Sequence, residues 1–228
     1  MIEIIPAINC ELHDGDAVVT KLRKAEEFAK WVHLDVADGV FTFSKSWGDP
    51  EAWREMHPQI KVEVHLMVEH PERVVQDWLN AGINRIIVHY EAFPQTKTKT
   101  DKLREYAFAE ITERAHHAGA EIMLAINPET TLVMAEPFFK YFDSFQIFSQ
   151  AHAGPSGQKF LPTVLPKITA LREQYADATI EVDGGIKLET GQAAVRAGAN
   201  ALAAGSFIFS AKDPKANFKL LRSLDEKA

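Results

Sequence analysis

The chain has 228 residues, of which 46% are hydrophobic and 25% charged, a composition typical of a globular protein that can bury a full core. Its net charge of -7 argues against a nucleic-acid partner, because binding to a phosphate backbone draws on many Lys and Arg side chains. No run approaches the roughly 18 apolar residues of a membrane span, and the amino terminus lacks a signal-peptide pattern, so we expect a cytoplasmic protein without a membrane partner.

Apolar, β-branched runs alternate with segments of helical period along the whole sequence, without a linker rich in Gly, Ser or Pro. This alternation predicts one domain over residues 1–228. The expected strands are 3–5, 31–36, 61–67, 85–90, 121–126, 144–148, 179–182 and 199–203. Between them lie apolar helical stripes such as Leu22, Ala25, Phe28 and Ala29. Eight strand–helix units favour a closed (β/α)8 barrel over an open doubly wound sheet.

Local signals mark where the expected helices begin and end. Asp49-Pro50 and His70-Pro71 place a proline near a first helical turn. Gly82, Gly119 and Gly198 each follow a stretch of helical pattern, as glycine often does at a helix carboxyl end. These signals agree with the alternation of strands and helices.

Polar residues gather at the carboxyl ends of three expected strands, where barrels carry their active sites. His33 and Asp35 are two residues apart on one strand, so both face the barrel interior, and the same parity turns His65 inward on the next strand and Asp183 on the seventh. Each residue alone has an ordinary structural explanation as a hydrogen-bonded interior group. Together they favour a site for one divalent metal, Zn²⁺, Fe²⁺, Mn²⁺ or Co²⁺, because clustered buried carboxylates are costly without a cation.

Glu63 and Glu181 lie one inward position deeper on the same strands, and Met67 lies one inward position beyond His65. The two glutamates are candidates for orienting the metal ligands, or for bridging water, rather than for catalysis. His89 and Glu91 share a face at the end of the fourth strand and are interpreted equally well as a packing or hydrogen-bonding pair. His152 could reach a substrate, although a plain loop residue is the simpler interpretation.

Small residues cluster in the last third of the chain, where barrels commonly bind phosphate through backbone N–H groups. The members of these clusters are Gly154, Gly157, Gly184, Gly185, Gly205 and Ser206. The alternative is that they only form tight turns. The segment GPSGQK does not have the spacing of a nucleotide-binding P-loop, so a nucleoside triphosphatase is unsupported.

Ordered sequence blocks run almost end to end and resemble the ribulose-phosphate 3-epimerase family. They read HLDVADG at 33–39, VHLMVEHP at 64–71, HYEA at 89–92, NPETT at 127–131, GQKFLPTVLPKI at 157–168, EVDGGI at 181–186 and AGSFIF at 204–209. The resemblance implies a TIM barrel of the ribulose-phosphate-binding type and a small phosphorylated ketose as substrate. It is also compatible with a homo-oligomer.

The same resemblance implies a division of roles among the clustered residues. His33, Asp35, His65 and Asp183 would be the metal ligands, and Asp35 and Asp183 would exchange protons at C3 of the sugar. Backbone groups at 184–185 and 205–206 would hold the phosphate, with Met67 also near the substrate. These roles describe a 3-epimerase that interconverts D-ribulose 5-phosphate and D-xylulose 5-phosphate.

Several positions that would line the sugar pocket depart from the family pattern. Ala7 stands where the family has serine, Ala37 where it has methionine, and 152–158 differs from the family's glycine-rich loop. The segment 94–102 looks like an insertion. The departures leave open another ketose, such as a hexulose 6-phosphate, or a barrel that binds sugar phosphate without catalysis. A lyase of the same barrel group is less favoured, because its second-strand lysine is absent from His33–Asp38.

Overall fold

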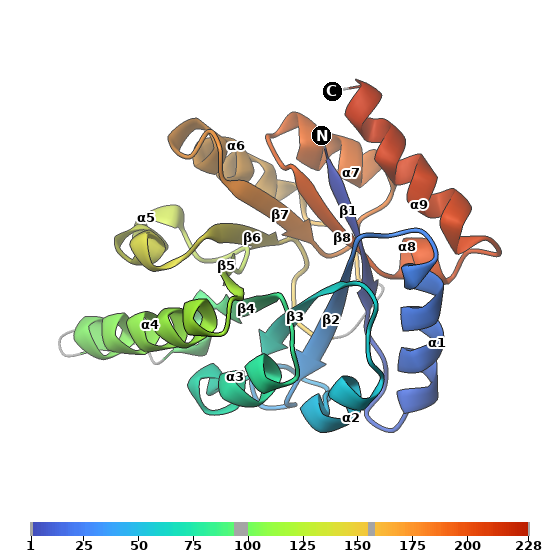
Figure 1. Ribbon diagram of the computed structural model, residues 1–228. Coiled ribbons are helices and arrows are strands. Elements are labelled where there is room, and N and C mark those ends of the chain that lie inside the picture. Colours follow the sequence, from blue (N-terminus) through green and yellow to red (C-terminus); the bar gives the residue numbers. More distant parts are fainter. Residues whose placement is uncertain (1, 94–99, 155–157, 228) are drawn as a thin grey trace.

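A closed barrel of eight parallel strands forms the centre of the computed structural model, which describes residues 2–93, 100–154 and 158–227. The strands follow one another in chain order, and β1 closes the barrel against β8 (Figure 1). Their bounds are β1 Glu3–Ile8, β2 Trp31–Ala37, β3 Lys61–Met67, β4 Arg85–His89, β5 Glu121–Ile126, β6 Ser144–Phe148, β7 Thr179–Asp183 and β8 Ala201–Ala204. The predicted (β/α)8 barrel is therefore confirmed.

Helices surround the barrel and connect successive strands (Figure 1). Their bounds are α1 Gly15–Glu26, α2 Pro50–Glu55, α3 Pro71–Asn80, α4 Thr100–His117, α5 Leu132–Ala135, α6 Leu165–Gln174, α7 Leu188–Arg196, α8 Ser206–Phe209 and α9 Pro214–Arg222. Short 3-10 segments span Tyr90–Ala92, Glu136–Tyr141, Pro162–Val164 and Ser223–Lys227. Proline opens α2 and α3 as predicted, and Asp49 caps α2 by accepting hydrogen bonds from two backbone N–H groups.

Strands β1 and β8 differ most from their predicted bounds, whereas β2, β4 and β7 each differ by one residue at the carboxyl end. Strand β1 continues past Ile5, because Pro6 still pairs in register with Ala204 of β8. Strand β8 begins two residues later than predicted, because the backbone N–H of Ala199 bonds back to Ala194 and completes the end of α7. The longer β1 carries the chain up to the barrel mouth, where its following residues can reach the site.

The two faces of the barrel wall have different chemistry. Outward side chains such as Leu34 and Val36 pack against the helices in the main hydrophobic core, as the strand parity predicted. Inside the barrel the apolar cluster is small and consists of Ile87, Met123 and Ala125. The described interior also contains buried polar and charged groups, which determine the chemistry of the site.

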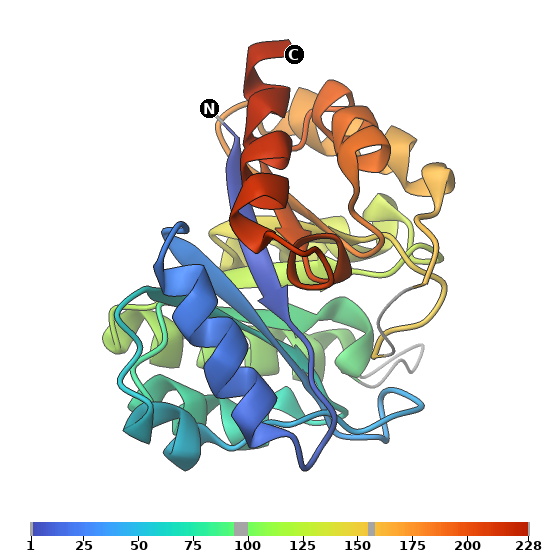
Figure 2. The ribbon, with the colours of Figure 1, turned by 90° about the vertical axis from the view of Figure 1, so that its right-hand side faces the viewer.

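The ends of the described chain lie together at the amino-terminal end of β1, away from the barrel mouth (Figure 2). The backbone N–H of Ile2 donates to Asp225 there, at 3.0 Å. Within the described ranges, no helix is both long and apolar enough to cross a membrane. The predicted insertion at 94–102 falls largely outside the described residues, and α4 begins at Thr100.

Candidate active site

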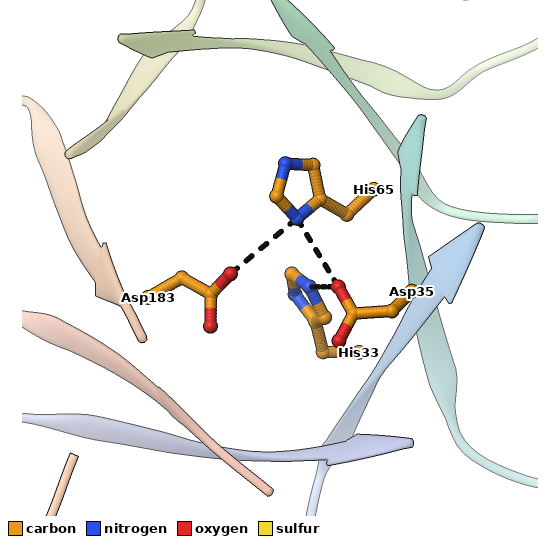
Figure 3. A group of neighbouring side chains, drawn as sticks. All are labelled: His33, Asp35, His65 and Asp183. Carbon is orange, nitrogen blue, oxygen red and sulfur yellow. Dashed lines mark hydrogen bonds and ion pairs between the residues drawn. The ribbon is translucent and has the colours of Figure 1, made fainter. Parts of the chain in front are cut away.

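Four buried side chains converge at the barrel mouth: His33 and Asp35 from β2, His65 from β3 and Asp183 from β7. One ligand atom from each lies within 4.8 Å of all the others. The β2–β3 register places Asp35 beside His65, while Asp183 reaches in from the opposite wall (Figure 3). The predicted cluster is thus brought together by strand parity and barrel closure.

Nitrogen and oxygen atoms of the four side chains lie close to one another. His65 Nδ1 lies 3.3 Å from Asp35 Oδ1 and 3.4 Å from Asp183 Oδ2, and His33 Nε2 lies 3.2 Å from the same Asp35 oxygen. Although His65 Nδ1 is fully buried, it makes no well-aligned hydrogen bond within the described part of the chain. An unpaired buried nitrogen between two carboxylates is the arrangement expected of a metal ligand.

The far side of His33 is fixed by charged groups deeper in the barrel. Its Nδ1 lies 2.7 Å from Glu63, whose other oxygen accepts from Arg85 at 2.6 Å. Burial raises the pKa of the neighbouring Glu181 well above the usual value, and the charge of Glu63 raises it further. Gln146 donates to Glu181 at 2.9 Å. The predicted role of orienting a metal ligand fits Glu63, because Glu63 contacts His33 directly.

The far side of His65 is fixed by a second chain of contacts. Its Nε2 lies 2.7 Å from Nε2 of His89, and Nδ1 of His89 lies 3.4 Å from Glu91. Glu91 in turn accepts a hydrogen bond from the backbone N–H of Asn127 at 3.0 Å. If Nδ1 of His65 is kept free for a metal, Nε2 carries the proton and donates to His89. The pair left open by the sequence is therefore a hydrogen-bonded support for a site residue.

The pKa values of the site show that it favours positive charge. Burial alone would lower the pKa of His33, but hydrogen bonds to Asp35 and Glu63 raise it well above the usual value. Burial likewise acts to lower the pKa of His65, and Asp183 and Asp35 outweigh it. Burial would raise the pKa of Asp35, yet the two histidines hold it well below the usual value. The site thus favours the carboxylate form of Asp35, which a compensating cation would suit.

These observations fit a divalent metal ion. Two imidazole nitrogens and two carboxylate oxygens form a donor set suited to Zn²⁺, Fe²⁺, Mn²⁺ or Co²⁺. Each histidine also has a hydrogen-bonding partner behind it, at Glu63 and at His89, as metal-ligating histidines usually do. The buried cluster could therefore hold a metal through the four atoms that face one another.

A pocket opens directly above the cluster and contains most of the residues predicted to bind substrate. The predicted residues that line it, together with Asp35 and Asp183, are Met67, Gly154, Gly184, Gly185, Gly205 and Ser206. Gly157 lies outside the described residues. Ala7 also lines the pocket, whereas Ala37 is buried and does not. Residues from β7 and β8 and the loops after them thus lie beside the cluster.

Asn9 and Lys21 are among the pocket residues that the sequence analysis missed. Asn9, just beyond β1, donates to Asp35 Oδ2 at 3.2 Å and to the carbonyl of Gly154 at 2.9 Å. Lys21 of α1 also lines the pocket. Asn9 follows a strand predicted to end at Ile5, so its parity could have identified it only with the correct strand end. Nothing in the helical period of α1 singles out Lys21.

Two loops meet over the pocket. The ring of Phe43, which is 81% exposed, packs edge-on against His152 with centroids 5.1 Å apart. A side chain at Gly154 would place its Cβ 3.0 Å from Cβ of Thr42. The loop that contains His152 and Gly154, which departs from the family pattern, therefore contacts the loop that contains Thr42 and Phe43. His152 therefore contacts the aromatic ring of Phe43 rather than the buried cluster.

Sequence comparison gives one family and consistent relatives. The model of the "Ribulose-phosphate 3 epimerase family" matches residues 8–209. A ribulose-phosphate 3-epimerase of Synechocystis is 38% identical over 194 residues, covering 82% of this chain and 78% of the relative. One of Schizosaccharomyces pombe is 34% identical and covers 87% and 83%, and one of Bacillus subtilis is 30% identical and covers 94% and 95%.

Comparison with solved structures supports the fold. A 3-hexulose-6-phosphate synthase from Salmonella typhimurium superposes with a TM-score of 0.71 at 15% identity, covering 99% of each chain. An orotidine 5'-phosphate decarboxylase from Pyrococcus horikoshii has a TM-score of 0.63 at 13% identity and covers 98% and 99%. At such identities the likeness concerns the barrel architecture alone.

Proposed function

Because the chain belongs to the ribulose-phosphate 3-epimerase family and is thus a carbohydrate epimerase, we propose that it interconverts D-ribulose 5-phosphate and D-xylulose 5-phosphate at a divalent metal centre. The observation that carries this proposal is the pairing of Asp35 and Asp183, which reach from β2 and β7 into one pocket (Figure 3). Inversion of a carbon needs a proton donor and a proton acceptor on its two faces. Two carboxylates from opposite walls provide both.

The proton at C3 of a 2-ketose is acidic because the neighbouring carbonyl takes up the charge left behind when it departs. Asp35 is suited to accept it, since its two histidine neighbours keep the carboxylate ionised. Asp183 then delivers a proton to the opposite face, and the two exchange roles in the reverse direction. A bound metal would act as a Lewis acid toward the substrate oxygens.

The remaining pocket residues position the substrate. Asn9 holds one oxygen of Asp35, so the other oxygen stays directed toward His33 and His65. His33, His65 and one oxygen of each aspartate would hold the metal. The backbone at Gly184–Gly185 and Gly205–Ser206 is suited to the phosphate, because glycine lets N–H groups approach an anion closely.

Asp35→Asn and Asp183→Asn test the two-base assignment. We expect each variant to lose about 10²- to 10⁴-fold in epimerisation, measured with D-ribulose 5-phosphate and added Mn²⁺, Zn²⁺, Co²⁺ or Fe²⁺. In D₂O each should still exchange the C3 proton of one epimer, and the two variants should differ in which epimer. Asp177→Asn, at an exposed site before β7, is the control. Wild-type turnover by either active-site variant would refute its role.

A further inference from the structure

We propose that Lys21 pairs with the substrate phosphate and makes the enzyme select phosphorylated over unphosphorylated ketoses, an inference that rests on the proposed function. Lys21 projects from α1 to the pocket wall, on the side formed by β1 and α8. It is the one basic side chain among the described residues that line this pocket. The two acidic groups there would otherwise repel a dianionic substrate.

The ammonium group of Lys21 is held in place by its neighbours. It donates to the backbone carbonyl of Asn9 at 3.0 Å and to Sγ of Cys10 at 3.3 Å, and it lies 5.9 Å from the ring centroid of Phe209. These partners belong to the segment just after β1 and to α8, so the side chain spans from α1 to the pocket rim. An ammonium has three N–H groups, and two are used here, which leaves one for a ligand.

Lys21 has no acidic partner within the described ranges. The ion pairs found there include no contact between its Nζ and a carboxylate. Neither of its two hydrogen-bond acceptors carries a full negative charge unless Cys10 ionises, and burial raises the pKa of that thiol. A partly buried cation with neutral partners is favourably placed to receive an anion.

The position of Lys21 matches the part of the pocket suited to phosphate. A side chain at Gly205 would place its Cβ 3.0 Å from the carbonyl oxygen of Ala7, so the Gly205–Ser206 backbone lies against the end of β1. The contacts of Lys21 are to Asn9 and Cys10, which lie two and three residues after Ala7, and to Phe209, one helical turn beyond Ser206. The ammonium and the glycine backbone therefore lie on the same side of the pocket.

Separating the phosphate from the sugar tests the proposal. Lys21→Met keeps the apolar stem and removes the charge. We expect kcat/KM for D-ribulose 5-phosphate to fall by about 10- to 100-fold, the range for one hydrogen bond to a charged group. Turnover of unphosphorylated D-ribulose should stay unchanged, and Lys21→Arg should recover part of the loss. Lys24→Met, at an exposed position of the same helix, is the matched control.

Binding of inorganic phosphate, measured by calorimetry on the same proteins, gives a readout that does not depend on turnover. Lys21→Met should weaken it by a similar factor, and Lys24→Met should leave it unchanged. Equal losses with both sugars, or phosphate binding equal to that of the wild type, would overturn the assignment. If the wild-type protein turns over neither sugar, the proposed function fails, and the phosphate measurement still decides the role of Lys21.

Discussion

Replacing His89 tests whether the support behind His65 determines metal binding. In His89→Leu the Nε2–H of His65 loses its acceptor at 2.7 Å, in a place where both rings are fully buried. A buried donor without a partner costs about 1–3 kcal/mol, and loss of a hydrogen bond behind a metal-ligating histidine typically weakens metal binding about 10- to 100-fold. We expect the metal dissociation constant to rise within that range.

The length of each contact predicts an order among related variants. Glu91→Gln keeps an oxygen for the Asn127 N–H and lies at the end of a longer 3.4 Å contact to His89, so its effect should be less than about tenfold. Burial lowers the pKa of His89, so this ring is neutral near pH 7 and can accept from His65. His89→Gln retains an acceptor and should restore part of the affinity.

Competition with a chelator for Zn²⁺ or Co²⁺ measures the dissociation constants, and circular dichroism reports whether each variant is folded. His117→Leu, at an exposed position of α4, is the control. A folded His89→Leu protein that binds metal as tightly as the wild type would refute the orienting role of the His65–His89 contact. Weakening equal to that of the control would do the same.

Two further outcomes follow from the site and its loops. The pKa values of His33 and His65 are raised above the usual histidine value, so the metal-free site holds protons that a metal must displace. Metal affinity should therefore increase with pH through the range in which the two histidines titrate. A proton-release titration that shows no protons leaving near pH 7 when metal binds would contradict this prediction. Gly185→Ala should lower the free energy of unfolding in urea by more than about 2 kcal/mol, because its Cβ would lie 2.6 Å from the backbone nitrogen of Phe160. Gly82 has a similar positive φ but open space around it, so Gly82→Ala should cost about 1 kcal/mol. Equal costs would show that the close approach to Phe160 is not what requires glycine at position 185.

The sequence was sufficient to predict the barrel and the four clustered residues for a physical reason. Strands repeat every two residues, so the parity of His33 and Asp35 follows from their spacing alone, and barrel closure then brings Asp183 toward them. Apolar runs likewise located the eight strands. The family resemblance, which the comparisons confirm, identified the same residues independently. Their catalytic and metal-binding roles remain predictions.

The contacts around the cluster could not be predicted in the same way. Asn9 reaches Asp35 only because β1 continues through Pro6, which a strand pattern does not favour. Lys21 reaches the pocket because of how α1 is placed against β1, a tertiary arrangement that helical period does not encode. The supporting role of His89 follows from its 2.7 Å contact with His65 on the neighbouring strand, and this contact depends on side-chain rotamers rather than on sequence spacing.

Because the interior of the barrel is polar, the inward and outward residues of each strand are under different evolutionary constraints. Residues such as Leu34 pack outward against the helices, and their neighbours in sequence, such as Asp35, point into the reaction pocket. Outward positions can exchange one apolar residue for another of similar volume without touching the chemistry. The residues that pack the helices against the barrel can thus be substituted during evolution, or redesigned for thermal stability. The inward residues of the same strands remain constrained by the reaction.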